Sequence, residues 1–142
     1  MPTRHANATW EGGLKGGKGQ FSGESGAIAA SYSFLTRFGD TKGSNPEELL
    51  AAAEAACFSM ALSASLEGRG TPATKIETSA ACTVDRVADG FAVTNMKLTV
   101  RASVPGISDA DFQPVVAATK EGCPISKVMK GNVPIEVDAQ LV

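Results

Sequence analysis

Apolar and polar positions alternate at both ends of the chain, with a helical pattern between them. Residues 5–11, 20–24 and 28–34 show the period of two that is typical of strands, so the first forty residues (1–40) predict a small antiparallel meander. The glycine-rich stretch from Gly12 to Gly19 separates the first two strands. It partly matches a phosphate-binding loop, but Gly19 stands where Ser or Thr would hold magnesium, so a hairpin turn is the better prediction.

The period changes to that of a helix at residue 45. Asn45 or Ser44 supplies a capping side chain, Pro46 suits the first helical position, and Glu47 opposes the helix dipole. Gly68 ends the pattern. A central, buried helix over residues 45–68 is therefore predicted, with one apolar face formed by Leu49, Leu50, Ala53, Ala56, Cys57, Met60, Ala61 and Ala64.

Residues 73–142 predict a β-hairpin that turns at 88–90, a helix over 108–121 capped by Ser108, a short helix after Cys123, and a last strand over 133–141. The order of the elements indicates an α+β fold with antiparallel sheets. The length of 142 residues corresponds to a single domain, 1–142.

Composition narrows the function classes. Hydrophobic residues make up 43% and charged residues 20%, which is typical of a globular protein. The net charge of -2 without a basic stripe argues against nucleic acid as the main partner. One His and three scattered Cys do not form a metal-site motif. We expect no membrane span, because the apolar stretch 49–64 is short and interrupted by Glu54. No apolar leader is visible, so we expect a cytoplasmic protein with reduced thiols.

Two of the three cysteines are candidates for thiol chemistry. Cys57 lies in mid-helix, where activation would require a nearby cation, and Arg37 just before the helix is a candidate. Cys123 lies at a predicted helix start, where N–H dipoles favour a thiolate, so local chemistry alone makes it the more acidic thiol. Cys82, on a strand face, is expected to pack as a small hydrophobe. The spacing leaves open whether Cys57 and Cys123 meet.

Two motifs carry a resemblance to a known family. Residues 45–62, which read NPEELLAAAEAACFSMAL, and residues 122–126, which read GCPIS, resemble the signatures of the OsmC/Ohr family of organic-hydroperoxide-resistance proteins. VPGI at 104–107 and WEG at 10–12 also match. The resemblance covers essentially the whole chain. It implies an intertwined homodimer with antiparallel sheets wrapped around long central helices, and a peroxidase without flavin, haem or metal.

The resemblance also assigns roles to residues. It implies that Cys57 is the peroxidatic thiol, Cys123 the resolving thiol, and Arg37 with Glu47 the activating pair. Because the arginine precedes the helix and is absent from the glycine-rich turn, the chain is similar to the OsmC branch. The implied cycle reduces an organic hydroperoxide through a Cys57 sulfenic acid and a Cys57–Cys123 disulfide, which a dithiol such as a dihydrolipoamide carrier reduces. A role in the oxidative or osmotic stress response is also implied.

Three further expectations complete this interpretation. An apolar approach for the substrate is expected from Leu50, Ala53, Phe58 and Met60. Two alternatives to the enzyme remain open, a non-enzymatic redox switch and an apolar-ligand-binding protein on the same fold. On one straight helix, Glu47 and Cys57, which are ten residues apart, are separated by about 15 Å of rise and about 80° in direction. A Glu side chain does not close this gap, so we expect active sites that are shared between two chains.

Overall fold

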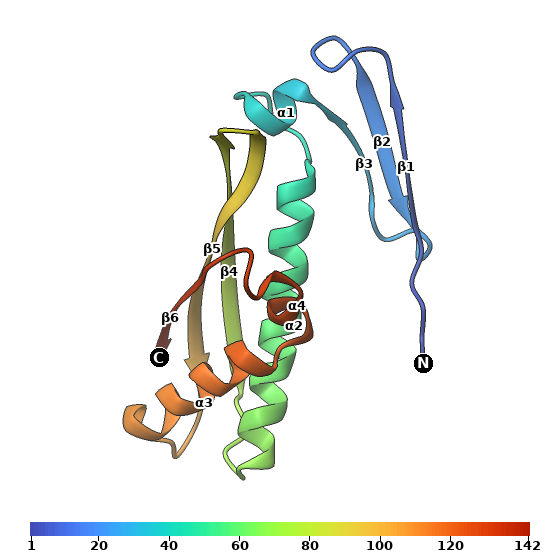
Figure 1. Cartoon of the computed structure of the whole chain (residues 1–142). Helices are drawn as coiled ribbons and strands as arrows, with labels where there is room; N and C mark the ends of the chain where they lie inside the picture. The colour runs from blue at the N-terminus through green and yellow to red at the C-terminus, as the bar shows by residue number, and fades with distance from the viewer. The chain divides into compact units, whose positions relative to one another are not determined.

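The computed structural model of the protein describes residues 1–142, in six strands and four helices. Its contacts divide the chain into two compact units, residues 1–49 and residues 50–142, called here the N-terminal and the C-terminal unit. The long central helix begins at the end of the first unit and continues through the second (Figure 1).

The N-terminal unit contains the predicted meander. Strands β1 (Ala6–Glu11), β2 (Lys18–Gly23) and β3 (Ala29–Ser33) pair antiparallel in that order. The glycine-rich segment is the turn between β1 and β2, as predicted, and no helix follows it. Gly19 is required by packing, because a Cβ at this position would lie 2.5 Å from the ring of Tyr32. Sequence periodicity therefore located this sheet correctly.

A short helix, α1 (Phe34–Phe38), follows β3 and was not predicted. The pattern indicated a strand to residue 34 and then a polar segment. The chain instead turns at Ser33, whose side chain accepts a hydrogen bond from the Thr36 N–H while Thr36 Oγ1 accepts one from the Ser33 N–H. This reciprocal capping box starts the helix. It places Arg37 in a helix rather than in a loop.

The central helix α2 (Pro46–Gly68) forms where the sequence predicts it. Asn45 caps it, since its side-chain oxygen accepts a hydrogen bond from the Glu48 N–H at 2.8 Å. Glu47 and Glu48 occupy the first turn, where negative charge is favourable.

The C-terminal unit consists of the rest of α2 and a second three-stranded sheet. Strands β4 (Lys75–Val87) and β5 (Gly90–Ser103) form the predicted antiparallel hairpin, and helices α3 (Asp109–Gly122) and α4 (Pro124–Met129) follow. Ser108 caps α3, as predicted. The last strand, β6 (Ile135–Leu141), pairs with β5 in parallel, so the expectation of purely antiparallel sheets was wrong. The crossover through α3 and α4 returns the chain to the end where β5 begins, and alternation alone does not reveal strand direction.

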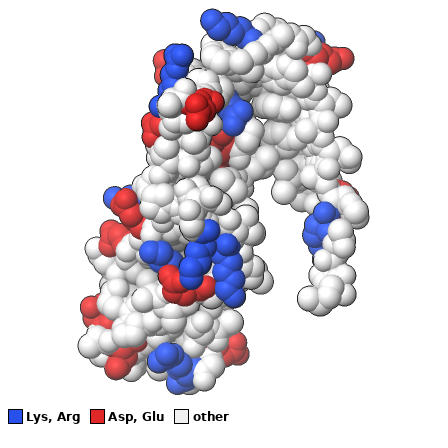
Figure 2. Space-filling model, viewed as in Figure 1, with Lys and Arg blue, Asp and Glu red and all other residues white.

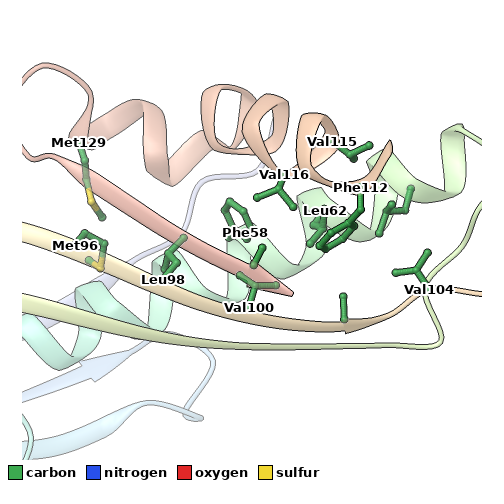
Figure 3. Packing of buried hydrophobic residues seen from close by; sticks show 13 residues of the cluster. Phe58, Leu62, Met96, Leu98, Val100, Val104, Phe112, Val115, Val116 and Met129 are labelled. Carbon is green, nitrogen blue, oxygen red and sulfur yellow. The ribbon is translucent and has the colours of Figure 1, made fainter. Parts of the chain in front are cut away.

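The core of the C-terminal unit lies between α2, α3 and the sheet. Figure 3 shows Phe58 and Leu62 of α2 and Phe112, Val115 and Val116 of α3 packed over the β5 side chains Leu98 and Val100. The fully buried residues of this cluster are Phe58, Leu62, Leu66, Met96, Leu98, Val100, Ala102 and Phe112.

The buried face of α2 is not the predicted one. Phe58, Leu62 and Leu66 point into the core, whereas Ala53 and Met60 of the predicted face are exposed. The helix is apolar around most of its circumference, so spacing could not select a face. The larger side chains bury more apolar area and therefore face inward. Exposed small side chains are left on α2: Ala52, Ala53, Ala56 and Ala64.

The sequence pattern predicts an apolar segment that is too short to span a membrane, but the length of α2 contradicts this prediction. By length and composition, α2 is apolar enough to cross a bilayer, with a mean hydropathy of 1.6 over its most apolar 18 residues. The core helix of a soluble domain passes the same test. Acidic and basic side chains lie interspersed on the face shown in Figure 2.

Candidate functional site

Two helices of the C-terminal unit bring two thiols together. Cys57 lies in the middle of α2, and Cys123 lies at the junction where α3 ends and α4 begins. Their Sγ atoms are 3.1 Å apart, well beyond the disulfide length of about 2.05 Å. Both cysteines are therefore free in this structure, and their sulfur atoms are in contact. The sequence had left open whether they meet, and it had correctly placed Cys123 as the N-cap of a helix that continues with Pro124.

The two thiols differ in exposure and in surroundings. Cys57 is half-buried and Cys123 is fully buried. Burial raises the pKa of the Cys57 thiol, and Cys123 and the negative charge of Glu54 raise it further, against a hydrogen bond from the Ile125 backbone that lowers it. Within the C-terminal unit, the balance favours the neutral thiol. A reactive Cys57 thiolate therefore requires a positive charge from elsewhere.

The N-terminal unit contains a pre-oriented positive charge. The Arg37 guanidinium donates two hydrogen bonds from Nε to the carboxylate oxygens of Glu47, each at 3.1 Å, and a third from Nη2 at 2.7 Å. Glu47 is buried, while about a third of the Arg37 side chain is exposed. Carboxylate binding fixes the planar guanidinium in one orientation. The pairing of Arg37 with Glu47 is thus present within one chain.

A cavity of about 250 Å³ adjoins this arginine. Its lining includes the rings of Trp10, Tyr32 and Phe34 together with Leu14 and the Arg37 side chain. Arg37 also lies 4.9 Å from the ring centre of Phe38. The cavity therefore combines apolar walls with one cation, which suits a small apolar molecule that carries a polar or anionic end.

The four residues expected to contact a substrate occupy different environments. Ala53 and Met60 are exposed, and Met60 retains 75% of its maximal exposure. Leu50 is half-buried against the core. Phe58 is fully buried and belongs to the core of the C-terminal unit.

Sequence analysis missed one polar contact beside the thiols. The sequence pattern marks Glu54 only as an interruption of the apolar stretch, but in the structure it is fully buried and its Oε1 accepts a hydrogen bond from Ser126 Oγ at 2.6 Å. Its other oxygen, Oε2, is buried without a hydrogen-bond partner. The only sequence signal for this contact is a lone charged residue among the alanines of the helix motif. Elsewhere, Cys82 is half-buried on β4, and no group of three or more His, Cys, Asp or Glu gathers as in a metal site.

Comparison with known proteins gives this arrangement a context. A family model described as OsmC-like protein matches residues 39–138, which include α2 and both cysteines. The chain belongs to the OsmC family. Peroxiredoxin OsmC of Escherichia coli (strain K12) is 45% identical over 134 residues, covering 94% of each chain. An organic hydroperoxide resistance protein of Xanthomonas axonopodis pv. citri is 28% identical, covering 94% of this chain and 90% of that one.

Solved structures show the same fold. The crystal structure of the organic hydroperoxide resistance protein OhrB of Bacillus subtilis matches this OsmC-family chain with a TM-score of 0.75 at 25% identity, covering 96% of this chain and 98% of that one. The α+β architecture with a long central helix is therefore confirmed. In this family setting, α2 is the core helix of the domain rather than a membrane span.

Proposed function

We propose that this OsmC-family chain is a thiol-dependent peroxidase that reduces organic hydroperoxides to alcohols. The observation that carries the proposal is the pair of free cysteines, Cys57 and Cys123, with 3.1 Å between the two Sγ atoms. The relatives, a peroxiredoxin and organic hydroperoxide resistance proteins, support the same activity.

The proposed cycle has two steps on the protein. The Cys57 thiolate attacks the distal oxygen of the hydroperoxide, the O–O bond breaks, and the alkoxide leaves and takes up a proton to become the alcohol. Cys57 becomes a sulfenic acid. The sulfur of Cys123 then attacks the sulfenic sulfur, a disulfide forms, and the hydroxyl leaves with the thiol proton as water. Half-burial of Cys57 permits access of the peroxide, whereas full burial of Cys123 reserves it for the second step.

The first step requires a cation, and we assign this role to Arg37, held by Glu47. A guanidinium beside the sulfur would offset the burial and the acidic neighbour that raise the pKa of Cys57. We propose that Arg37 and Glu47 of one protomer act on Cys57 of another in a homodimer. The exposed alanine face of α2 supports this proposal, since small side chains permit close approach of a second helix.

The substrate class follows from the surfaces near these groups. We propose that the alkyl or aryl part of the hydroperoxide occupies the apolar cavity beside Arg37. We also propose that Leu50, Ala53 and Met60 form the approach to Cys57, and that the buried Phe58 packs beneath them. Burial of apolar area favours bulky organic hydroperoxides over hydrogen peroxide. A dithiol, such as dihydrolipoamide on a carrier protein in the cytoplasm, would then reduce the disulfide by exchange.

A turnover assay tests the proposal. Purified protein is mixed with a large excess of cumene hydroperoxide and a dithiol, and peroxide consumption is followed. Catalytic consumption, with kcat/KM higher for cumene hydroperoxide than for hydrogen peroxide, is expected. A single stoichiometric oxidation would instead indicate a redox switch, and no oxidation would indicate an apolar-ligand-binding protein. Either of these two results would overturn the proposed enzyme.

A further inference from the structure

The buried contact between Glu54 and Ser126 connects the helix of Cys57 with the helix of Cys123. Ser126 lies in the first turn of α4, and Cys123 is the N-cap of that helix. The Lys127 N–H donates to the Cys123 carbonyl at 3.0 Å, which closes this first turn. Because Cys123 and Ser126 belong to one hydrogen-bonded turn, whatever holds Ser126 also holds Cys123.

The same side of α2 contacts α4 through two neighbouring residues. Glu54 and Cys57 are three positions apart, so they lie on one face of the helix. Glu54 accepts the hydrogen bond from Ser126 at 2.6 Å, and the Cys57 sulfur lies 3.1 Å from the sulfur of Cys123, the N-cap of α4. Two residues on one face of α2 therefore contact α4 and its N-cap.

A fully buried carboxylate with one unpartnered oxygen is an expensive feature in a core. Glu54 has no exposed surface, and its Oε2 lacks a hydrogen-bond partner. Glu54 also raises the pKa of Cys57, which opposes formation of the attacking thiolate. Glu54 therefore opposes the first chemical step, and its contact with Ser126, three residues from Cys123, points to a role in the second step.

We propose that Glu54 is a positioning residue for disulfide formation: by accepting the Ser126 hydrogen bond it holds α4, and with it Cys123, against Cys57. The inference rests on the proposed peroxidase cycle and adds a determinant of its second step. Without the tether, Cys123 attacks the sulfenic acid more slowly, and Cys57 remains open to a second hydroperoxide. That second reaction transfers another oxygen to sulfur, releases another alcohol, and yields the sulfinic acid.

Four variants separate this role from a general structural one. Ser126→Ala removes the hydrogen-bond donor, and Ser126→Thr retains a hydroxyl at the same position. Glu54→Gln retains the shape of the side chain and removes its charge. Ser59→Ala is the matched control, because the Ser59 hydroxyl donates to Thr78 Oγ1 at 2.8 Å and so ties the same helix to β4.

The measurement is a single turnover of each reduced variant with one equivalent of cumene hydroperoxide, quenched at intervals. Mass spectrometry counts the Cys57 sulfenic acid, trapped with dimedone, and the Cys57–Cys123 disulfide. We expect Ser126→Ala to slow disulfide formation about tenfold or more while the rate of sulfenic acid formation stays unchanged. Excess hydroperoxide should then increase its share of Cys57 sulfinic acid. Ser126→Thr and Ser59→Ala should behave as the wild type.

Glu54→Gln provides a measurement that a purely structural role of Glu54 would leave unchanged. Cys123 and Glu54 are the titratable groups that act on Cys57 within the C-terminal unit, so removal of the Glu54 charge lowers the pKa of Cys57. The first step should become faster below that pKa, while disulfide formation stays close to the wild-type rate, because the Gln carbonyl still accepts the hydrogen bond from Ser126. A fall of both steps together, or equal disulfide rates in Ser126→Ala and the wild type, would overturn the inference. So would a failure of Ser126→Thr to restore the rate.

Oxidation with diamide keeps this test separate from the proposed activity. Diamide adds to one thiolate, and the second thiol displaces the reduced hydrazine to form the disulfide without any hydroperoxide. We expect the Cys57 adduct to persist longer in Ser126→Ala than in the wild type. Equal lifetimes would contradict the tether. If the lifetime of the Cys57 adduct depends on Ser126 as expected but the protein does not consume hydroperoxides, only the proposed function is contradicted.

Discussion

At the scale of single residues, Cys57 is in an environment that does not activate it by itself. Burial and acidic neighbours raise the pKa of its thiol, although a thiol peroxidase requires the thiolate. The charge that would reverse this balance is on Arg37, which Glu47 already orients through three hydrogen bonds. Reactivity is therefore expected to depend on two residues that are distant from Cys57 in sequence.

The roles of the three cysteines predict a clear division of effects. Cys57→Ser should abolish turnover, because the attacking sulfur is lost. Cys123→Ser should permit one oxidation of Cys57 and then stall or overoxidise, since no second thiol completes the cycle. Cys82→Ala should be almost silent in activity. Peroxide consumption and mass spectrometry of the oxidised protein check these outcomes, and a disulfide that links Cys57 to Cys82 as the main product would contradict the assignment.

The activating arginine predicts a change in pH dependence. At pH values below the pKa of Cys57 the thiolate fraction falls as that pKa rises, so Arg37→Ala should move the rise of Cys57 alkylation rate to higher pH. The rate of cumene hydroperoxide reduction at neutral pH should fall about 100-fold or more. Arg69→Ala, at an exposed arginine after α2, is the control. Superimposed alkylation profiles of Arg37→Ala and the wild type would show that Arg37 does not act on this thiol.

At the scale of elements, α2 has two different faces despite its uniform apolarity. Phe58, Leu62 and Leu66 fill the core of the C-terminal unit, while small residues remain exposed on other sides. The helix thereby supplies both the packing of its own unit and a surface that a second helix can approach closely.

The orientation of α2 predicts a difference between neighbouring positions. Leu62→Ala should lower the free energy of unfolding by about 2–5 kcal/mol, because it leaves a cavity among fully buried side chains. Ser63→Ala, one residue further and exposed, should change it by no more than about 0.5 kcal/mol. Chemical denaturation at equal protein concentration measures both values. A small effect at Leu62 would mean that α2 is rotated relative to the structure.

At the scale of the whole molecule, the groups proposed to act together belong to two separate units of the chain. Arg37 and Glu47 belong to the N-terminal unit, and Cys57 and Cys123 belong to the C-terminal unit. Along one helix, ten residues between Glu47 and Cys57 correspond to about 15 Å, which a glutamate and an arginine in mutual contact do not readily span. A second copy of the chain, related by a two-fold axis, offers another route to Cys57.

Shared sites predict complementation between inactive chains. Cys57→Ser and Arg37→Ala proteins, each expected to be inactive alone, are unfolded together and refolded, so that hybrid dimers form if the proposed homodimer exists. A hybrid contains one complete site if Arg37 acts on the partner's thiol, and part of the activity should return. Hybrids that are shown to form and yet remain inactive would mean that Arg37 acts within its own chain.

The sequence by itself determined the local elements and the chemistry they carry. Capping residues at Asn45 and Ser108, a period of two in the strands and the start of a helix after Cys123 are local signals, and each element formed where its signal lies. The short helix α1 was missed because its signal is a capping box of only two side chains, Ser33 and Thr36. The motifs around the two cysteines identified the family before any contact was known.

Only the tertiary structure decided how these elements meet. An apolar helix offers several faces of similar hydrophobicity, so packing against β5 and α3 selected the face with Phe58 and Leu62. Strand direction depends on the path of the crossover, which made β6 parallel to β5. The contact between Cys57 and Cys123, and the tether from Glu54 to Ser126, join residues that are 66 and 72 positions apart. Spacing along a chain does not specify such contacts, because they arise when separate helices pack on a common core.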